Sequence, residues 1–362
     1  MVNVSFKCED KVRIALALDD LGVDSIEAGF PTVSEGEFKA VKEISKEVVN
    51  SEVVALCRSD IKDIEKALDA DVDAVHIFIA TSDIHLKYKL KISREDALKR
   101  ATKAVEYAKS HGLIVEFSAE DATRTEWNFL VNFFQEIVNA GADRLDIADT
   151  VGVMWPSKIA ELVKFIRSNV RGSYLLSVHC HNDFGMATAN SVAAVEAGAN
   201  QVHVTVNGIG ERAGNAALEE VVSAIHFLLG YKTGIKLEKI RQVSELVANL
   251  AGISIPPNKP IIGTNVFAHK SGIHVHGVIV NPETYEPIRP ELIGAERKIR
   301  LGKHSGKHAI EYAIKMLGFE PKSELISEVL RRVKEIGDKG VELSINDLEK
   351  IIREILKDQQ NN

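Results

Sequence analysis

Hydrophobic residues along the chain form short runs separated by longer stretches with helical periodicity. Seven runs have the length of a β-strand: residues 25–30, 52–58, 74–80, 113–120, 143–150, 174–181 and 200–208. Their centres lie 22 to 38 residues apart, as in a repeated strand-plus-helix unit. The intervening segments place apolar residues at helical spacing, and several end on glycine. This pattern predicts seven βα units of a TIM (β/α)₈ barrel.

The first strand of this barrel is missing from the pattern. The chain opens almost directly on a predicted helix at residues 8–22, which leaves no sequence for a strand before it. An open seven-stranded barrel has two unpaired strand edges. We therefore expect either that the sequence is truncated at its N-terminus or that something else closes the barrel.

The strand–helix rhythm stops after residue 235. A breaker-rich segment, SIPPNKPIIG (254–263), precedes a histidine-rich segment and, near the end, two charged amphipathic helices. We expect a catalytic TIM-barrel domain over 1–235, a linker and first subdomain with a histidine-rich lid over 236–305, and a helical second subdomain over 306–362. His269, His274 and His276 lie within eight residues, with Gly272 and Gly277 beside them, which favours a loop that reaches into a site.

Composition and charge exclude several classes of function. The chain has 45 Lys and Arg against 52 Asp and Glu, a formal charge of −7, which argues against a nucleic-acid or membrane-surface partner. Its three scattered cysteines predict no disulfide framework and a reducing compartment. No apolar run is long enough to span a bilayer, and the N-terminus lacks the features of a signal peptide. We expect a cytoplasmic protein.

Polar and titratable residues gather at the C-terminal ends of the predicted strands, where barrel enzymes place their active sites. They include His76, His85, Ser118, Glu120, Asp121, Arg124, Asp149, Thr150, His179, His181, Asn207, Glu211, Arg212 and Asn215. This convergence of titratable groups indicates catalysis.

His179 and His181 are the best candidates for a metal site. They lie two residues apart on one strand, so both rings point to the same face. Two imidazoles at a strand end bind a divalent metal when oxygen ligands complete the shell. The alternative is a pair of hydrogen-bonded structural histidines.

Two further groups also have a structural alternative. Glu120, Asp121 and Arg124 would serve equally as an N-cap and surface ion pairs at the start of the next helix. Asn215, in a glycine-containing loop, would serve as a turn residue in a left-handed conformation.

Eight motifs in order resemble the acyl-CoA condensing enzymes of the DRE-TIM metallolyase superfamily, which includes homocitrate synthase, 2-isopropylmalate synthase and citramalate synthase. The motifs are IEAGFP (26–31), HIFIATSDIHLKYKL (76–90), EFSAEDATRTE (116–126), ADTVG (148–152), HCHNDFGMATANS (179–191), NGIGERAGNAALEE (207–220), HKSGIHVHG (269–277) and LGKHSGKHA (301–309). The resemblance implies a TIM barrel followed by small subdomains. It also implies a homodimer in which a subdomain of one protomer covers the neighbour's active site.

The resemblance further implies a Claisen-type acyltransferase reaction between acetyl-CoA and a 2-oxo acid. A divalent metal, Mg²⁺, Mn²⁺ or Zn²⁺, would be held by His179, His181 and Asn215 and would polarise the ketone. Glu120 and His274 match the family's catalytic pair. His76, Ser118 and Thr150 match substrate-contacting positions, and Glu211 and Arg212 match the loop beside the metal.

One departure from the family pattern concerns the N-terminus. Family members carry an Arg-Asp/Glu motif on the first strand, and this sequence begins just after that position. A non-catalytic metal-binding form is therefore an alternative to an enzyme. A lyase of the same superfamily is another, although the LGKHSGKHA region favours a synthase.

Several features bear on the choice of 2-oxo acid. The ADT sequence (148–150), Lys270 and the NPETYEP segment (281–287) resemble homocitrate synthases, which use 2-oxoglutarate. Glu116, however, stands where some homocitrate synthases have an arginine, and His276 stands where isopropylmalate synthases usually have aspartate. We expect homocitrate synthase of lysine biosynthesis first, 2-isopropylmalate synthase of leucine biosynthesis second and citramalate synthase third.

Overall fold

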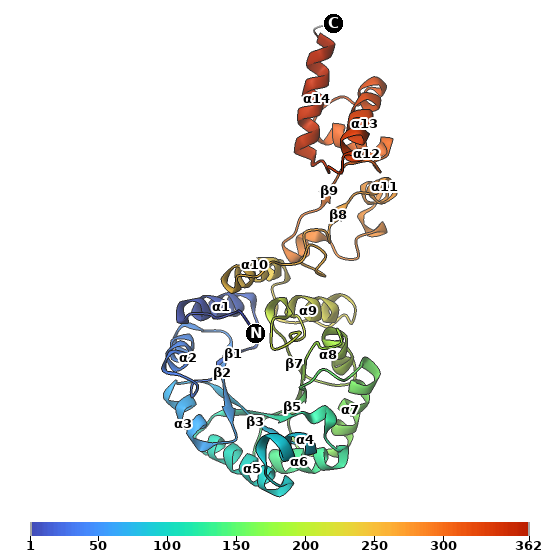
Figure 1. Ribbon diagram of the computed structural model, residues 1–362. Helices are drawn as coiled ribbons and strands as arrows, with labels where there is room; N and C mark the ends of the chain where they lie inside the picture. Colours follow the sequence, from blue (N-terminus) through green and yellow to red (C-terminus); the bar gives the residue numbers. More distant parts are fainter. Residues whose placement is uncertain (1, 361–362) are drawn as a thin grey trace. The chain divides into compact units, whose positions relative to one another are not determined.

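The computed structural model describes residues 2–360, and the chain divides into two compact units between Ile255 and Pro256 (Figure 1). This division differs from the expected boundary at residue 235, because the helix over residues 240–251 belongs to the first unit. The finer division of the second unit at residue 305 stays a prediction.

The first unit is a seven-stranded parallel sheet that curls into most of a barrel, with its helices on the outside (Figure 1). The strands pair in chain order, as the sequence predicts for a TIM barrel: β1 (Ser25–Gly29), β2 (Glu52–Arg58), β3 (Ala74–Ala80), β4 (Ile114–Glu120), β5 (Arg144–Asp149), β6 (Leu175–Cys180) and β7 (Gln201–His203). The helices of this unit are α1 (Cys8–Leu21), α2 (Glu35–Glu47), α3 (Ile61–Asp69), α4 (Asp83–His85), α5 (Arg94–Ser110), α6 (Trp127–Asn139), α7 (Pro156–Asn169), α8 (Ala187–Glu196), α9 (Leu218–Phe227) and α10 (Ile240–Ala251).

Alternation along the strands separates an apolar outer face from a polar inner face. In β4, Val115, Phe117 and Ala119 are buried in the core that the helices cover, whereas Glu116 and Ser118 point the other way. Bulky branched side chains dominate the interior of most TIM barrels. Because this interior is lined with titratable groups, it is suited to bind a polar ligand or to catalyse a reaction.

The seventh strand is shorter than the predicted run over 200–208, so that prediction is wrong at its C-terminal end. The strand stops at His203, and Asn207 and Gly208 take left-handed backbone conformations with φ of 63° and 68°. The Thr205 N–H donates to the Ala216 carbonyl instead of to a neighbouring strand (3.0 Å). The chain thereby turns back over the end of the sheet.

The second unit is mainly helical. It contains the short strands β8 (Ala268–His269) and β9 (Lys298–Ile299) and the helices α11 (Gly272–Val280), α12 (Lys307–Met316), α13 (Ser323–Asp338) and α14 (Ile345–Gln360). The last two helices are the amphipathic ones predicted from the sequence. Within the part of the chain that the structure describes, no helix is long and apolar enough to cross a membrane.

The histidine-rich segment is a short strand at His269 followed by a helix, so its prediction as a loop is wrong. His274 and His276 both lie in α11, despite Gly272 and Gly277. Val275 and Val278, three residues apart, are buried on one face of this helix. This packing outweighs the weak helix propensity of glycine and of β-branched residues.

Candidate active site

The inner face at the C-terminal end of β6 presents the two predicted metal-binding histidines. The ring centroids of His179 and His181 are 5.0 Å apart, and their Nε2 atoms are separated by 3.3 Å. Asn215 is brought beside them by an antiparallel bridge to His181. The predicted trio therefore converges, although 34 residues separate His181 from Asn215 in the sequence (215 − 181 = 34).

The two Nε2 atoms are within hydrogen-bond distance, as the structural alternative expects, but two other polar atoms of the trio have no such partner and favour a metal site. Among the described residues, His181 Nδ1 and Asn215 Oδ1 are buried and have no hydrogen-bond partner. Buried polar atoms of this kind are rare unless an ion or water satisfies them. Asn215 does not have a left-handed φ either, which removes the reason to interpret it as a turn residue. An imidazole pair and an amide oxygen are suitable donors for a divalent cation.

Electrostatics keeps both imidazoles neutral, which is the form that binds metals. Burial, together with the neighbouring His203 and His181, lowers the pKa of His179 to about 3. Burial and the nearby Arg212 guanidinium also lower the pKa of His181.

The loop after β7 packs against the neighbouring strand ends through Arg212. Its guanidinium donates to both carboxylate oxygens of Asp183 (2.7 and 2.8 Å) and to the Thr150 carbonyl (2.7 Å). Glu211, the other predicted residue of this loop, is exposed, and its carbonyl accepts from the Gly214 N–H (2.9 Å). Arg212 thus links the chain segments that follow β5, β6 and β7 by hydrogen bonds beside the histidine pair.

Replacing Gly214 by alanine is expected to destabilise the protein by about 2–4 kcal/mol, which thermal unfolding would measure. Gly214 has a φ of 91°, and a Cβ there would lie 1.9 Å from the Gly208 carbonyl oxygen. Gly185→Ala is the matched control, because Gly185 also has a positive φ (73°) but a Cβ would meet nothing within 4 Å. Equal losses in the two variants would show that backbone strain alone, rather than this close approach, sets the cost.

Glu120 ends β4 on the same side of the sheet. Its side chain is 16% exposed, forms an ion pair with Lys89 and lies 3.5 Å from His85 Nδ1. The next residue, Asp121, pairs with Arg124 (2.8 Å) at the start of a 3₁₀ turn, and its N–H donates to the Thr150 hydroxyl (2.8 Å). Asp121 and Arg124 form the ion pair that the structural alternative expects, but Asp121 is buried and its side chain caps no helix. Glu120 is directed to a different set of partners.

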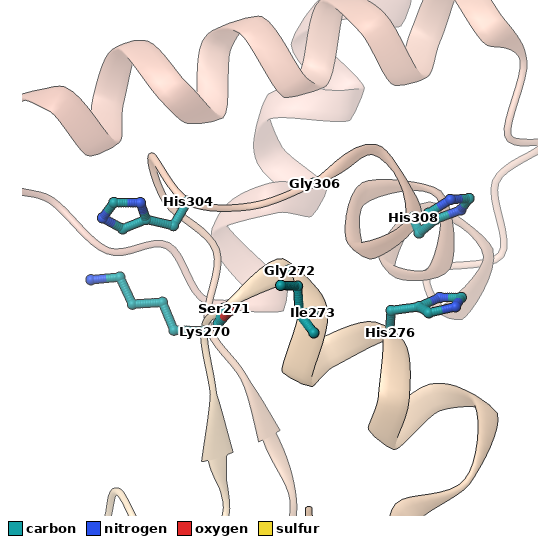
Figure 2. A pocket seen from close by; sticks show the side chains of 8 residues that line it. All are labelled: Lys270, Ser271, Gly272, Ile273, His276, His304, Gly306 and His308. Carbon is teal, nitrogen blue, oxygen red and sulfur yellow. The ribbon is translucent and has the colours of Figure 1, made fainter. Parts of the chain in front are cut away.

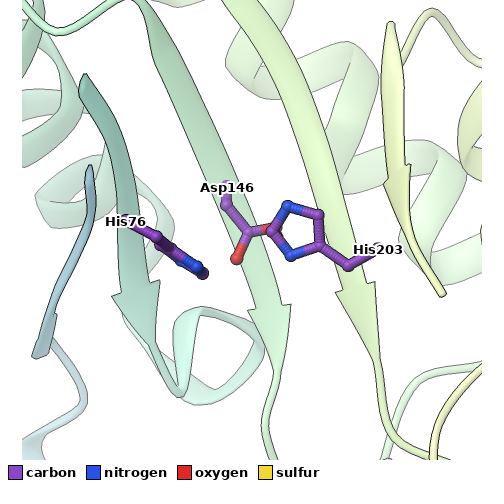
Figure 3. Close-up of side chains that lie close together, drawn as sticks. All are labelled: His76, Asp146 and His203. Atoms are coloured by element: carbon purple, nitrogen blue, oxygen red, sulfur yellow. The ribbon is translucent and has the colours of Figure 1, made fainter. Parts of the chain in front are cut away.

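A buried polar network below these strand ends was missed in the sequence. Figure 3 shows that His76 of β3, Asp146 of β5 and His203 of β7 point toward one another, and their potential ligand atoms lie within 4.8 Å. Predicted residues His76 and Ser118 are part of this network. His76 contacts Glu27 (2.6 Å) and Ser118 (2.8 Å), and the Ser118 hydroxyl donates to Asp146. Alternation of polar residues along a strand, such as Glu116 and Ser118 in β4, marks the polar face in the sequence but does not show which side chains meet on it.

Within this network, the positive charge of a histidine is paired with the negative charge of carboxylates. Burial disfavours the imidazolium form of His203, but Glu116 and Asp146 outweigh this effect and raise its pKa to about 10. Burial opposes ionisation of Glu116 too, but His203 lowers the pKa of that carboxyl group below its usual range. Because the ring nitrogens of His76 and Nε2 of His203 already have partners, a cation at this trio would have to displace them. His179, His181 and Asn215 are therefore the better candidates for the metal.

His274, the predicted catalytic histidine, lies in the second unit, where its ring stacks on Tyr285 with centroids 4.1 Å apart. A cavity of about 830 Å³ opens beside the start of the same helix (Figure 2). It is lined by Lys270, Ser271, Gly272, Ile273, His276, His304, Gly306 and His308. The catalytic role of His274 stays a prediction.

Comparisons with known proteins agree with this architecture. Residues 1–247 match the HMGL-like family, and residues 261–341 match the homocitrate synthase post-HMGL domain-like family. A probable 2-isopropylmalate synthase of Ignicoccus hospitalis is 58% identical, over 99% of this chain and 90% of that protein. The (R)-citramalate synthase of Methanocaldococcus jannaschii is 54% identical, over 98% of this chain and 72% of that protein.

A solved structure shows the same barrel at lower sequence identity. Hydroxymethylglutaryl-CoA lyase from Pseudomonas aeruginosa has a TM-score of 0.62 and 23% identity, covering 69% of this chain and 88% of that chain. This likeness concerns the fold alone. The family models and the relatives together show that the chain belongs to the divalent-metal-dependent DRE-TIM metallolyases, among the acyltransferase enzymes that condense acetyl-CoA with a 2-oxo acid.

Proposed function

We propose that this protein is a 2-isopropylmalate synthase, which condenses acetyl-CoA with 2-oxoisovalerate and releases CoA when water hydrolyses the thioester of the condensed product. The observation that carries the proposal is the charge pairing inside the barrel, because His76 and His203, the basic side chains of the described inner network, are each already paired with a carboxylate. The name of the Ignicoccus hospitalis relative supports the same choice.

Three basic side chains of the barrel interior are each engaged by a carboxylate. Arg144 donates to both oxygens of Glu52 (2.6 and 2.8 Å), His203 contacts Glu116 (2.8 Å) and His76 contacts Glu27 (2.6 Å). Arg144 and Glu52 each begin a strand, so their pair lies at the end of the barrel opposite His179 and His181. A distal carboxylate of 2-oxoglutarate that reached His76 or His203 would have to displace the carboxylate already paired with it. The isopropyl group of 2-oxoisovalerate carries no charge, so its binding displaces no carboxylate.

Glu120 is the residue best placed to act as the base. The reaction requires that the C–H bond of the thioester methyl group breaks, its proton passing to the base and its electron pair to the enolate that attacks the ketone. Glu120 offers a largely shielded carboxylate at the end of β4, the side of the sheet on which His179 and His181 also lie. A divalent cation held by His179, His181 and Asn215 would supply Lewis-acid polarisation of that ketone.

The proposal predicts a strong preference among 2-oxo acids. With added Mg²⁺, Mn²⁺ or Zn²⁺, we expect kcat/KM for 2-oxoisovalerate to exceed that for 2-oxoglutarate by about 100-fold, which is ~2.7 kcal/mol. The measurement is CoA release from acetyl-CoA with 2-oxoisovalerate, pyruvate and 2-oxoglutarate in parallel. A preference for 2-oxoglutarate would contradict the proposal.

Homocitrate synthase is the second candidate, and specific sequence features favour it. The ADT sequence at 148–150, Lys270 and the NPETYEP segment resemble homocitrate synthases, and residues 261–341 match a domain model named after that enzyme. We place it second because Glu116, where some homocitrate synthases have an arginine, is a carboxylate bound to His203 and Gln201.

A further inference from the structure

The Glu120 carboxylate is held by a short helical segment to which the proposed function gives no role. This segment follows β3 and consists of α4 and the π-helix η1 (Leu86–Leu90). Lys89 Nζ forms an ion pair with Glu120 Oε1, and His85 Nδ1 lies 3.5 Å from the same oxygen. Because residues 85 and 89 are four apart, they share one face of the segment. Both contacts use Oε1, so neither of them engages Oε2.

The segment itself is fixed to the turn that follows Glu120 at the end of β4. Leu86 is buried, and the Ser82 hydroxyl, which accepts from the His85 N–H (3.4 Å), donates to Asp121 next to Glu120. Arg94, the first residue of α5, donates two hydrogen bonds to the Asp83 carboxylate at the start of the segment (2.9 Å each). The relative placement of Lys89 and Glu120 is therefore set by the backbone of both loops.

The geometry of the segment is locally unusual in a way that supports a functional role. Five residues take π-helical geometry, and Lys91 ends them with a left-handed φ of 54°. Single π turns inside or beside α-helices occur frequently at functional sites, and a left-handed non-glycine residue has an energetic cost. Here the left-handed residue Lys91 ends the turn that directs Lys89 toward Glu120.

We propose that Lys89 is a positioning residue that fixes the rotamer of Glu120, so that Oε2 faces the thioester methyl group. This inference rests on the proposed function, in which Glu120 is the base. The Lys89 side chain is 50% exposed, so its own removal leaves no cavity in the core. Its loss is expected to let the carboxylate sample other rotamers, which slows proton abstraction without weakening the binding of the 2-oxo acid.

The test compares Lys89→Met, Lys89→Arg and the control Lys87→Met in the full chain. Lys87 lies on the same π-helix, where its Nζ is 4.9 Å from the Tyr88 ring centroid. For Lys89→Met we expect kcat to fall about tenfold while KM for the 2-oxo acid stays within about twofold. The isotope effect on kcat with methyl-deuterated acetyl-CoA should rise, because proton abstraction becomes more rate-limiting. Lys89→Arg should recover at least about half of kcat, since it restores the cation.

The outcomes separate this inference from the function on which it rests. An active wild-type enzyme whose kcat and isotope effect are unchanged in Lys89→Met would overturn the positioning role alone. The positioning role would also be overturned if kcat fell equally in Lys89→Met and Lys89→Arg, or equally in Lys89→Met and Lys87→Met. A wild-type protein that forms no product with any of the three 2-oxo acids would overturn both.

Discussion

Replacing either His179 or His181 by alanine is expected to reduce condensation activity by more than about 1000-fold and to weaken metal binding. Each substitution removes one of the two imidazoles whose Nε2 atoms lie 3.3 Å apart, and the Asn215 amide oxygen cannot replace it. Because both rings are half-buried on a strand of the sheet, their loss leaves the surrounding strands paired. Metal content of the purified variants, measured by elemental analysis, should fall together with activity.

A histidine far from the site provides the control for this prediction. His111 is exposed at the end of α5, where its ring packs on Tyr107 with centroids 4.4 Å apart. His111→Ala should keep the wild-type activity and metal content. If His179→Ala and His181→Ala also kept both, the metal would be held elsewhere, and the trio of His76, Asp146 and His203 would become the alternative.

Glu120→Gln is expected to lower kcat by about 10² to 10⁴-fold, the range associated with the loss of a positioned general base. The amide keeps the shape of the side chain but cannot accept the methyl proton. Metal content and KM for the 2-oxo acid should stay close to wild type, because the histidine pair is intact. The measurement is steady-state CoA release at saturating substrate.

Glu106→Gln is the matched control, since Glu106 is exposed on α5 and lies outside the candidate site. A fall of the same size in both variants would indicate a general effect on the protein. If Glu120→Gln retained more than about a tenth of the wild-type kcat, another group would have to be the base.

The fold was largely predictable because helices cover one face of the sheet. The apolar residues of that face, such as Val115 and Phe117 in β4, recur at period two and mark each strand in the sequence. The seventh strand was predicted too long, because the turn that ends it depends on backbone hydrogen bonds of Thr205 with the Ala216 carbonyl and the Leu218 N–H rather than on local hydrophobicity.

The candidate site was predictable at the strand ends but not inside the barrel. His179, His181 and Glu120 follow from their position where a parallel strand ends. Asp146 and His203 do not, because their significance depends on which strands lie side by side and on how far side chains reach across the interior. The pairing of His203 with Glu116 joins residues 87 positions apart, and the curled arrangement of β4 to β7 brings them together.

The most direct test of the central claim is identification of the product. The protein would be incubated with acetyl-CoA labelled with ¹³C in the methyl group, 2-oxoisovalerate and a divalent metal, and the products analysed by mass spectrometry. We expect labelled 2-isopropylmalate and one free CoA for each molecule formed, and neither after the metal is chelated. Labelled acetate with free CoA and no new carbon–carbon bond, or a condensation product from 2-oxoglutarate alone, would contradict the proposed function.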